Sequence, residues 1–144
     1  MKRLRLVLAT IATAALVLVP TTAAQANDGC SHVNGNAELD FGRNNGRARV
    51  FVDGERQFVN FRSIDFVETG PGTADITFKW FFDEGVITVV EHSASVPIGG
   101  PFLAIDSPVD VIAGGTGSMV WVGIVDVSKS IARFALGGQI CFDE

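Results

Sequence analysis

Tyrosine is absent from this 144-residue chain, and cysteine and histidine occur only twice each. The two histidines, His32 and His92, are far apart, and no CxxC or closely spaced histidine pair is present. We therefore expect no metal site and no other cofactor. Basic residues are also few, because 11 Lys and Arg stand against 16 Asp and Glu and give a net charge of −5. Phosphate backbones repel so acidic a chain, which argues against nucleic acid as a partner.

Long apolar runs are scarce, and the clearest one lies at the N-terminus. Residues 6–19 form an uncharged apolar run of 14 residues that follows Lys2, Arg3 and Arg5. An Ala-Gln-Ala sequence ending at Ala26 comes next. These are the three parts of a secretory signal peptide, and we expect cleavage after Ala26. A membrane anchor is the alternative, but a transmembrane helix needs about 20 apolar residues.

Removal of the expected signal peptide, residues 1–26, would leave one domain of 118 residues over 27–144. Its 8 basic and 16 acidic residues would give a net charge of −8. The longest later uncharged stretch, residues 111–125, contains four glycines and is too short to cross a membrane. We therefore expect a secreted protein that is not held in a membrane after cleavage.

Cys30 and Cys141 lie near opposite ends of the expected mature chain. An even number of cysteines in an exported protein predicts a disulfide. The bridge would require the first and last elements to lie side by side. Two metal ligands are the alternative, but the sequence offers them no partners.

Phe, Val, Ile and Thr are frequent, and turn residues interrupt the chain at short intervals, which indicates an all-β fold. Alternation is clearest where Ile76, Phe78, Trp80 and Phe82 share one face. Strands are expected at residues 33–41, 47–53, 57–67, 75–82, 86–94, 103–113 (interrupted at Pro108), 119–127 and 131–142. About eight strands joined by short turns favour an eight-stranded antiparallel up-and-down β-barrel, with a β-sandwich as the alternative.

Glycines in the second half of the chain carry a family resemblance. The pieces are an apolar strand after Gly85, a turn after Ala113, a glycine at 123, and Gly137-Gly138 in the last strand. The turn consists of Gly114, Gly115, Thr116 and Gly117. Over residues 80–142 this arrangement resembles the allene oxide cyclase/dirigent barrel family. The resemblance implies an eight-stranded barrel, often trimeric, whose apolar interior guides a reactive small molecule. It assigns no catalytic residue to a position in this chain.

His92 is the candidate catalytic residue, since the imidazole pKa lies near neutrality and suits proton transfer. Glu91 precedes it, and adjacent strand residues point to opposite faces, so at most one of the two points inward. A rim position for His92 is the alternative. The glycine-rich turn lacks the residues of a phosphate-binding loop, and its glycines are expected to serve the turn itself.

Arginines and aromatics are concentrated in the first half of the mature chain. Five arginines fall between residues 43 and 62, and two of them, Arg47 and Arg49, share one face of a strand. We expect a solvated outer face of a hairpin, with an anionic ligand or an oligomer partner as the alternatives. Phe51, Phe61 and Phe81 are expected on the face opposite their apolar neighbours, so both faces carry aromatic rings. Either a ligand or a second copy of the chain would use such surfaces.

The sequence thus predicts a secreted barrel that binds or guides a small apolar molecule in its interior. A non-catalytic structural or interaction domain, which could form a homo-oligomer, is the alternative. A third possibility is an inhibitor-like sandwich with a protruding loop at residues 95–101. Whether the protein is an enzyme stays open, because no Ser-His-Asp set is assignable.

Overall fold

The computed structural model of the chain describes residues 29–144, so the expected signal peptide lies outside the described residues. Eight β-strands follow one another without an intervening helix in this part of the chain. They are β1 (Ser31–Asp40), β2 (Asn45–Val52), β3 (Glu55–Gly70), β4 (Thr73–Phe82), β5 (Gly85–Gly99), β6 (Phe102–Ala113), β7 (Gly115–Asp126) and β8 (Ile131–Phe142). No helix within residues 29–144 is long and apolar enough to cross a membrane.

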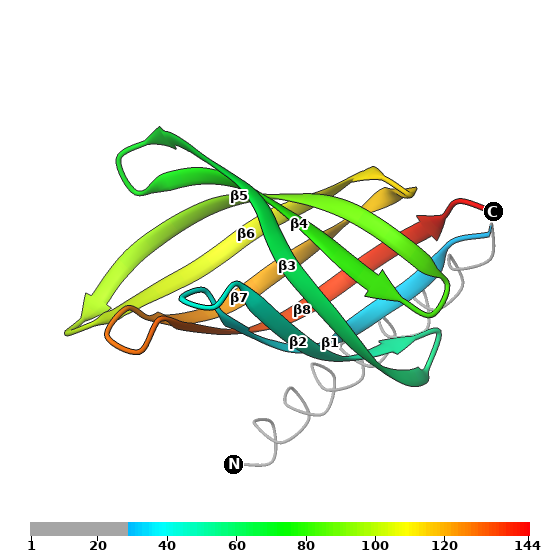
Figure 1. Cartoon of the computed structure of the whole chain (residues 1–144), viewed down its shortest axis with the longest axis horizontal. Helices are drawn as coiled ribbons and strands as arrows, with labels where there is room; N and C mark the ends of the chain where they lie inside the picture. The colour runs from blue at the N-terminus through cyan, green and yellow to red at the C-terminus, as the bar shows by residue number, and fades with distance from the viewer. Residues whose placement is uncertain (1–28) are drawn as a thin grey trace, which may run out of the picture.

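Each strand pairs antiparallel with the next, and β8 pairs with β1 to close the barrel (Figure 1). The closing seam is long and regular, from Ser31 opposite Ile140 to Asp40 opposite Ile131. The predicted eight-stranded antiparallel barrel is therefore confirmed, and the sandwich alternative is wrong. In a closed barrel each strand pairs with a neighbour on both sides, so most of its backbone N–H and C=O groups have partners. Closure thereby protects the sheet from edge-to-edge association.

Strict alternation of side chains places the core inside the barrel. In β2, Ala48, Val50 and Val52 are buried, whereas Arg47 and Arg49 are exposed, as the sequence pattern predicts. The predicted inward row of β4 is also confirmed, with Phe78, Trp80 and Phe82 buried. One predicted position is wrong, because Phe61 lies inside the barrel on the same face as buried Val59. The first strand, predicted over residues 33–41, ends at Asp40, so Phe41 falls in the following turn and is 43% exposed.

The predicted disulfide between Cys30 and Cys141 is confirmed. It connects the start of β1 to the end of β8, next to the pair formed by Ser31 and Ile140. The bond therefore covalently fastens the two strands that close the barrel. A metal-ligand role for these cysteines is ruled out by their pairing.

β6 runs without interruption through Pro108, although the sequence predicts a break there. The β5–β6 pairing passes from Glu91 opposite Val109 directly to Ser95 opposite Ile105. Pro108 lies in the interval between these pairs, while on the other side of β6 it lies opposite Val120 in a continuous pairing with β7. β5 also continues to Gly99, so the predicted loop at 95–101 is largely one arm of the β5–β6 hairpin.

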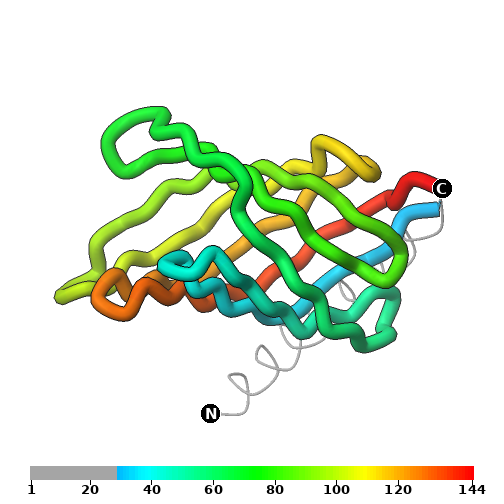
Figure 2. The backbone as a smooth tube through the Cα atoms, viewed as in Figure 1, coloured from blue at the N-terminus to red at the C-terminus, as the bar shows by residue number. Residues whose placement is uncertain are grey.

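The end of the barrel opposite the disulfide is uneven, because β3 is twice as long as β2. Pairing between β2 and β3 stops at Gly46 opposite Phe61, while β3 and β4 stay paired as far as Gly70 and Thr73. Residues 64–76, here called the β3–β4 arm, therefore project beyond the rest of the barrel (Figure 2). The arm and the β5–β6 hairpin are its most prominent extensions.

Candidate ligand-binding surfaces

A groove of about 790 Å³ lies on the outer surface, across β7, β8, β1, β2 and β3. One cross-strand row through it runs from Val122 to Ala135, Asn36, Arg49 and Phe58. In this row Ala135 and Asn36 have short side chains and Arg49 has a long one, while Val122 and Phe58 at the ends are aliphatic and aromatic. The hollow therefore follows from side-chain size along one row of an outward-facing sheet.

Apolar side chains line both borders of the groove. Val122 and Ile124 of β7 are each about half exposed, and Phe58 of β3 is 74% exposed. Gly123 lies between Val122 and Ile124, and a side chain there would point into the barrel, where an added Cβ would overlap the backbone oxygen of Arg133 and the side chain of Phe134. The outer face of the sheet thus presents unburied apolar surface along the groove.

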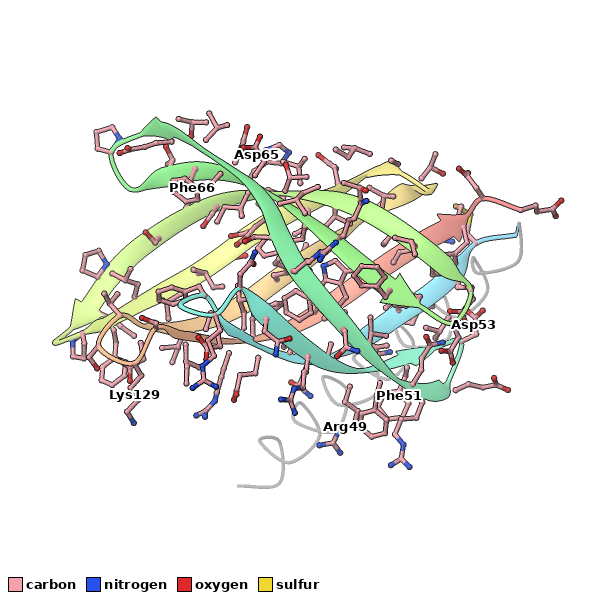
Figure 3. The ribbon with its side chains drawn as sticks, in the orientation of Figure 1. Arg49, Phe51, Asp53, Asp65, Phe66 and Lys129 are labelled. Atoms are coloured by element: carbon pink, nitrogen blue, oxygen red, sulfur yellow. A yellow bond between two sulfur atoms is a disulfide. The ribbon has the colours of Figure 1, made fainter. Side chains whose placement is uncertain are left out.

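Four cations line this groove, although the chain as a whole is acidic. Arg133 Nε donates a 2.8 Å bond to Glu38 Oε2 and is thereby neutralised. Arg47 and Arg49 form no ion pair with any residue in the described part of the chain. Figure 3 shows Arg49 and Lys129 extending from the same side of the barrel into solvent. Two guanidinium groups are consequently available to an anion at this surface.

The interior of the barrel is occupied by packed aromatic rings. Phe61 stacks on Trp80 with ring centroids 4.1 Å apart, and Trp121 stacks on Phe134 at 4.7 Å. Phe78 contacts Trp121 edge to face at 5.3 Å. This layer fills the region in which the sequence predicts a bound apolar molecule, so the described groove lies on the outer wall instead.

Two buried indole N–H groups within the described residues nevertheless lack a hydrogen-bond partner. They are Trp80 Nε1 and Trp121 Nε1, whereas the nearby Ser107 hydroxyl interacts with Glu91. Ser107 lies directly opposite Trp121 on the neighbouring strand, and the two indole rings are 5.5 Å apart. An unsatisfied buried polar group costs about 1–3 kcal/mol, so these atoms are disposed toward a polar ligand atom or water.

Glu91 is the buried acid of the interior and is only 5% exposed. Burial raises its pKa, and the hydroxyls of Ser107 and Ser93 oppose that effect by favouring the charged carboxylate. A carboxyl with a raised pKa among apolar side chains is a recognised feature of functional sites. From the sequence, Glu91 is named only as the neighbour of His92. Side chains alternate between the two faces of a strand, so Glu91 can be assigned to the interior once it is known which residues of the strand point inward.

His92, the sequence-predicted catalytic candidate, points outward. Its Nδ1 lies 2.9 Å from Asp75 Oδ1 on β4, and its Nε2 lies 3.0 Å from Asp110 Oδ2 on β6. The hydrogen bond to Asp75 raises the His92 pKa most, and the one to Asp110 adds to it. Both ring nitrogens are thus engaged in holding three strands together. His92 is brought close neither to His32 nor to the interior.

The predicted glycine turn is tighter than expected. Gly114 alone, with a φ of 76°, separates β6 from β7, and Gly115 already begins β7. Thr116 and Gly117 lie in β7, opposite Cys141 and Ile140. Residues 29–144 contain no group of three or more His, Cys, Asp or Glu side chains arranged to hold a metal ion.

Comparison with known proteins adds no assignment to this geometry. No family model matches the chain, and no curated protein or solved structure is significantly similar to it. What the site does must therefore be argued from its own residues.

Proposed function

We propose that this protein is a secreted binding protein that takes a small amphiphilic anion in its outer groove. The observation that carries the proposal is the pair Arg47 and Arg49, without carboxylate partners, beside exposed apolar side chains. The disulfide between Cys30 and Cys141 supports export, since such bonds persist in oxidising compartments.

The groove suits a ligand with an apolar body and one negatively charged group. Its volume of about 790 Å³ falls in the usual range of small-molecule sites, roughly 300–1,000 Å³. The apolar body would cover Val122, Ile124 and Phe58, and the anion would reach the two arginines. Guanidinium groups bind carboxylates and sulfonates through paired N–H donors, which gives orientation as well as affinity.

The proposal is tested with two fluorescent probes that share a naphthylamine body. 1-Anilinonaphthalene-8-sulfonate is anionic, whereas N-phenyl-1-naphthylamine is neutral. We expect the sulfonate to bind, and Arg47→Glu with Arg49→Glu to weaken its binding at least tenfold, about 1.4 kcal/mol, while the neutral probe changes little. Ala135→Trp should block both probes by filling the middle of the groove.

Matched controls separate the groove from other apolar surface. Ser118→Trp places the same bulk elsewhere on the exposed outside of β7, and Arg62→Glu reverses a charge outside the groove. Neither should alter binding. Equal affinity of the sulfonate for the wild type and the Ala135→Trp variant would rule out the proposal.

The interior is the second candidate site, favoured by the two unpaired indole N–H groups and by the buried carboxyl of Glu91. An apolar molecule with one polar atom would fit that chemistry if aromatic side chains moved aside. The chain's two tryptophans both lie inside, so 1-bromodecane, a contact quencher, should quench their fluorescence if it enters. Unquenched fluorescence in buffer, with full quenching after denaturation, would exclude this site.

Kinship with the allene oxide cyclase/dirigent barrels stays a prediction, as does a homo-oligomer. The barrel itself is compatible with that kinship, but many unrelated functions share one fold. A binding protein that acts without catalysis is the simpler expectation from an outer groove whose lining has no serine, cysteine or histidine.

A further inference from the structure

The β3–β4 arm has a free strand edge. Residues 64–70 of β3 pair with β4 on one side, but the pairing with β2 on the other side has already ended at Phe61. The Asn44 side chain closes the ladder by accepting the Ser63 N–H at 2.8 Å and donating to the Ser63 carbonyl at 2.8 Å. Beyond that point no described strand covers the outer edge of β3.

This edge is apolar and lacks blocking side chains, and its only interruptions within the described residues are the two bulges in its pairing with β4, at Ser63/Asp65 and Glu68/Gly70. Ile64, Phe66 and Val67 are 48%, 63% and 52% exposed, and residues 64–70 contain no proline, lysine or arginine. By contrast, the equally apolar end of β5 carries Pro97 between Val96 and Ile98. Proline and lysine are the residues with which proteins commonly block strand pairing at an edge.

The charges of the arm are all of one sign. Between Arg62 and Lys79 the chain carries Asp65, Glu68 and Asp75 and no basic residue. Asp75 is hydrogen-bonded to His92, and Asp65 Oδ1 accepts the Phe66 N–H at 2.9 Å. The second oxygen of Asp65 and the carboxylate of Glu68 are left for a partner. The edge thus presents four consecutive side chains in the order acid, apolar, apolar, acid.

The cross-strand register shows which face each of the four occupies. Phe66 lies opposite Ile76 and Glu68 opposite Ala74, on the face that continues the barrel interior. Asp65 lies opposite Thr77, and Val67 opposite Asp75, on the outer face. Each face therefore offers one apolar and one acidic side chain. A strand that pairs here is complementary on both faces if its own order is cation, apolar, apolar, cation.

We propose that residues 64–70 bind an extended segment of a partner protein whose core has the order cation–apolar–apolar–cation, by adding it as a strand to β3. Backbone hydrogen bonds along the free edge would supply affinity, and Asp65 and Glu68 would supply specificity. A second copy of this chain fits the same edge less well. Its own order sets Asp65 against Glu68 when the four residues align antiparallel, and like charges directly opposite one another destabilise a sheet.

The probes are two capped peptides, GTKVVKTG and GTEVVETG, which differ only in the sign of their charges. Isothermal titration of the purified protein should show binding of the lysine peptide and at least tenfold weaker binding of the glutamate peptide. In the double variant Asp65→Lys with Glu68→Lys, this preference should reverse. A reversal cannot arise from misfolding, because a damaged edge would bind neither peptide.

The control variant is Val96→Lys, which adds a lysine to an equally exposed position on β5 and should leave both affinities unchanged. Phe66→Lys should abolish binding of the lysine peptide. The proposal is overturned if the two peptides bind equally or not at all, or if charge reversal does not reverse the preference. It is also overturned if sedimentation shows a dimer that Phe66→Lys dissociates, since the occupant would then be a second copy.

Discussion

At the scale of single residues, neighbours one position apart have unrelated roles. Glu91 points into the barrel and is buried, while His92 points outward and bonds to two exposed carboxylates. The same division separates Val50 from Arg49 in β2. A strand period of two assigns each side chain to one of two environments, and that assignment decides whether a titratable group is desolvated or solvated.

Glu91 should make the protein less stable as the pH rises. Its pKa is raised in the folded state, so the native protein holds the proton more tightly than the unfolded chain. The stabilisation that results from protonated Glu91 is complete only below the pKa of the unfolded chain, 4.5. It is lost as the pH rises through the folded pKa. Glutamine mimics the protonated form of Glu91. At pH 8 we expect the free energy of unfolding of the Glu91→Gln variant to exceed that of the wild type by roughly 1 kcal/mol.

Urea unfolding of both proteins at pH 4.5 and pH 8 measures this difference. The gain of Glu91→Gln should be present at pH 8 and small at pH 4.5. Glu55→Gln, the same substitution at an exposed carboxyl of β3, is the matched control. A Glu91→Gln variant that is equally destabilised at both pH values would show that the carboxyl is needed in its charged form.

At the scale of elements, differences in strand length shape the barrel more than the amino-acid composition of the strands does. β2 has 8 residues and β3 has 16, and this mismatch alone creates the projecting arm and its free edge. On the neighbouring face, the His92 imidazole bridges β4, β5 and β6 through Asp75 and Asp110. Side-chain links of this kind support the sheet where the β5–β6 ladder is interrupted near Pro108.

The His92 bridge should also weaken as the pH rises. Hydrogen bonds to Asp75 and Asp110 raise its pKa, so its stabilising effect is complete below the unfolded value of 6.5 and disappears above the folded pKa. Because the ring is 44% exposed, solvent limits the effect to at most about 1 kcal/mol. In urea unfolding, His92→Gln should cost stability at pH 5.5 and little at pH 9. An equal cost at both would disprove an ionic bridge.

At the scale of the whole molecule, closure of the barrel depends on the contact between its first and last strands. β1 and β8 pair along ten residues, and the disulfide lies at one end of that seam. The bond closes a loop of 111 residues, which is nearly the whole described chain. Crosslinking so long a loop removes many conformations from the unfolded state.

Removing the disulfide should therefore cost stability without changing the fold. The double variant Cys30→Ser with Cys141→Ser is expected to lose up to about 4–5 kcal/mol, and reduced wild type should lose the same amount. Thermal unfolding with and without dithiothreitol measures both. An unchanged melting temperature in the reduced protein would mean that pairing of β1 with β8 suffices to close the barrel.

The sequence by itself determined the strand class, the approximate strand number and the disulfide. Alternation such as Ile76, Phe78, Trp80 and Phe82 is a local property, and turn residues limit where each strand ends. The same local evidence placed Arg47 and Arg49 together on an outer face, which is where the structure has them.

Only the tertiary structure decided which strand faces meet and what they form together. The groove needs Val122, Ala135, Asn36 and Arg49 in one row across four strands, and their register depends on pairing between residues far apart in sequence. Likewise, Glu91 is buried and Phe61 is an interior ring because the closed sheet has one interior, which all eight strands share. Cross-strand register and barrel closure are non-local, so no single strand's pattern encodes them.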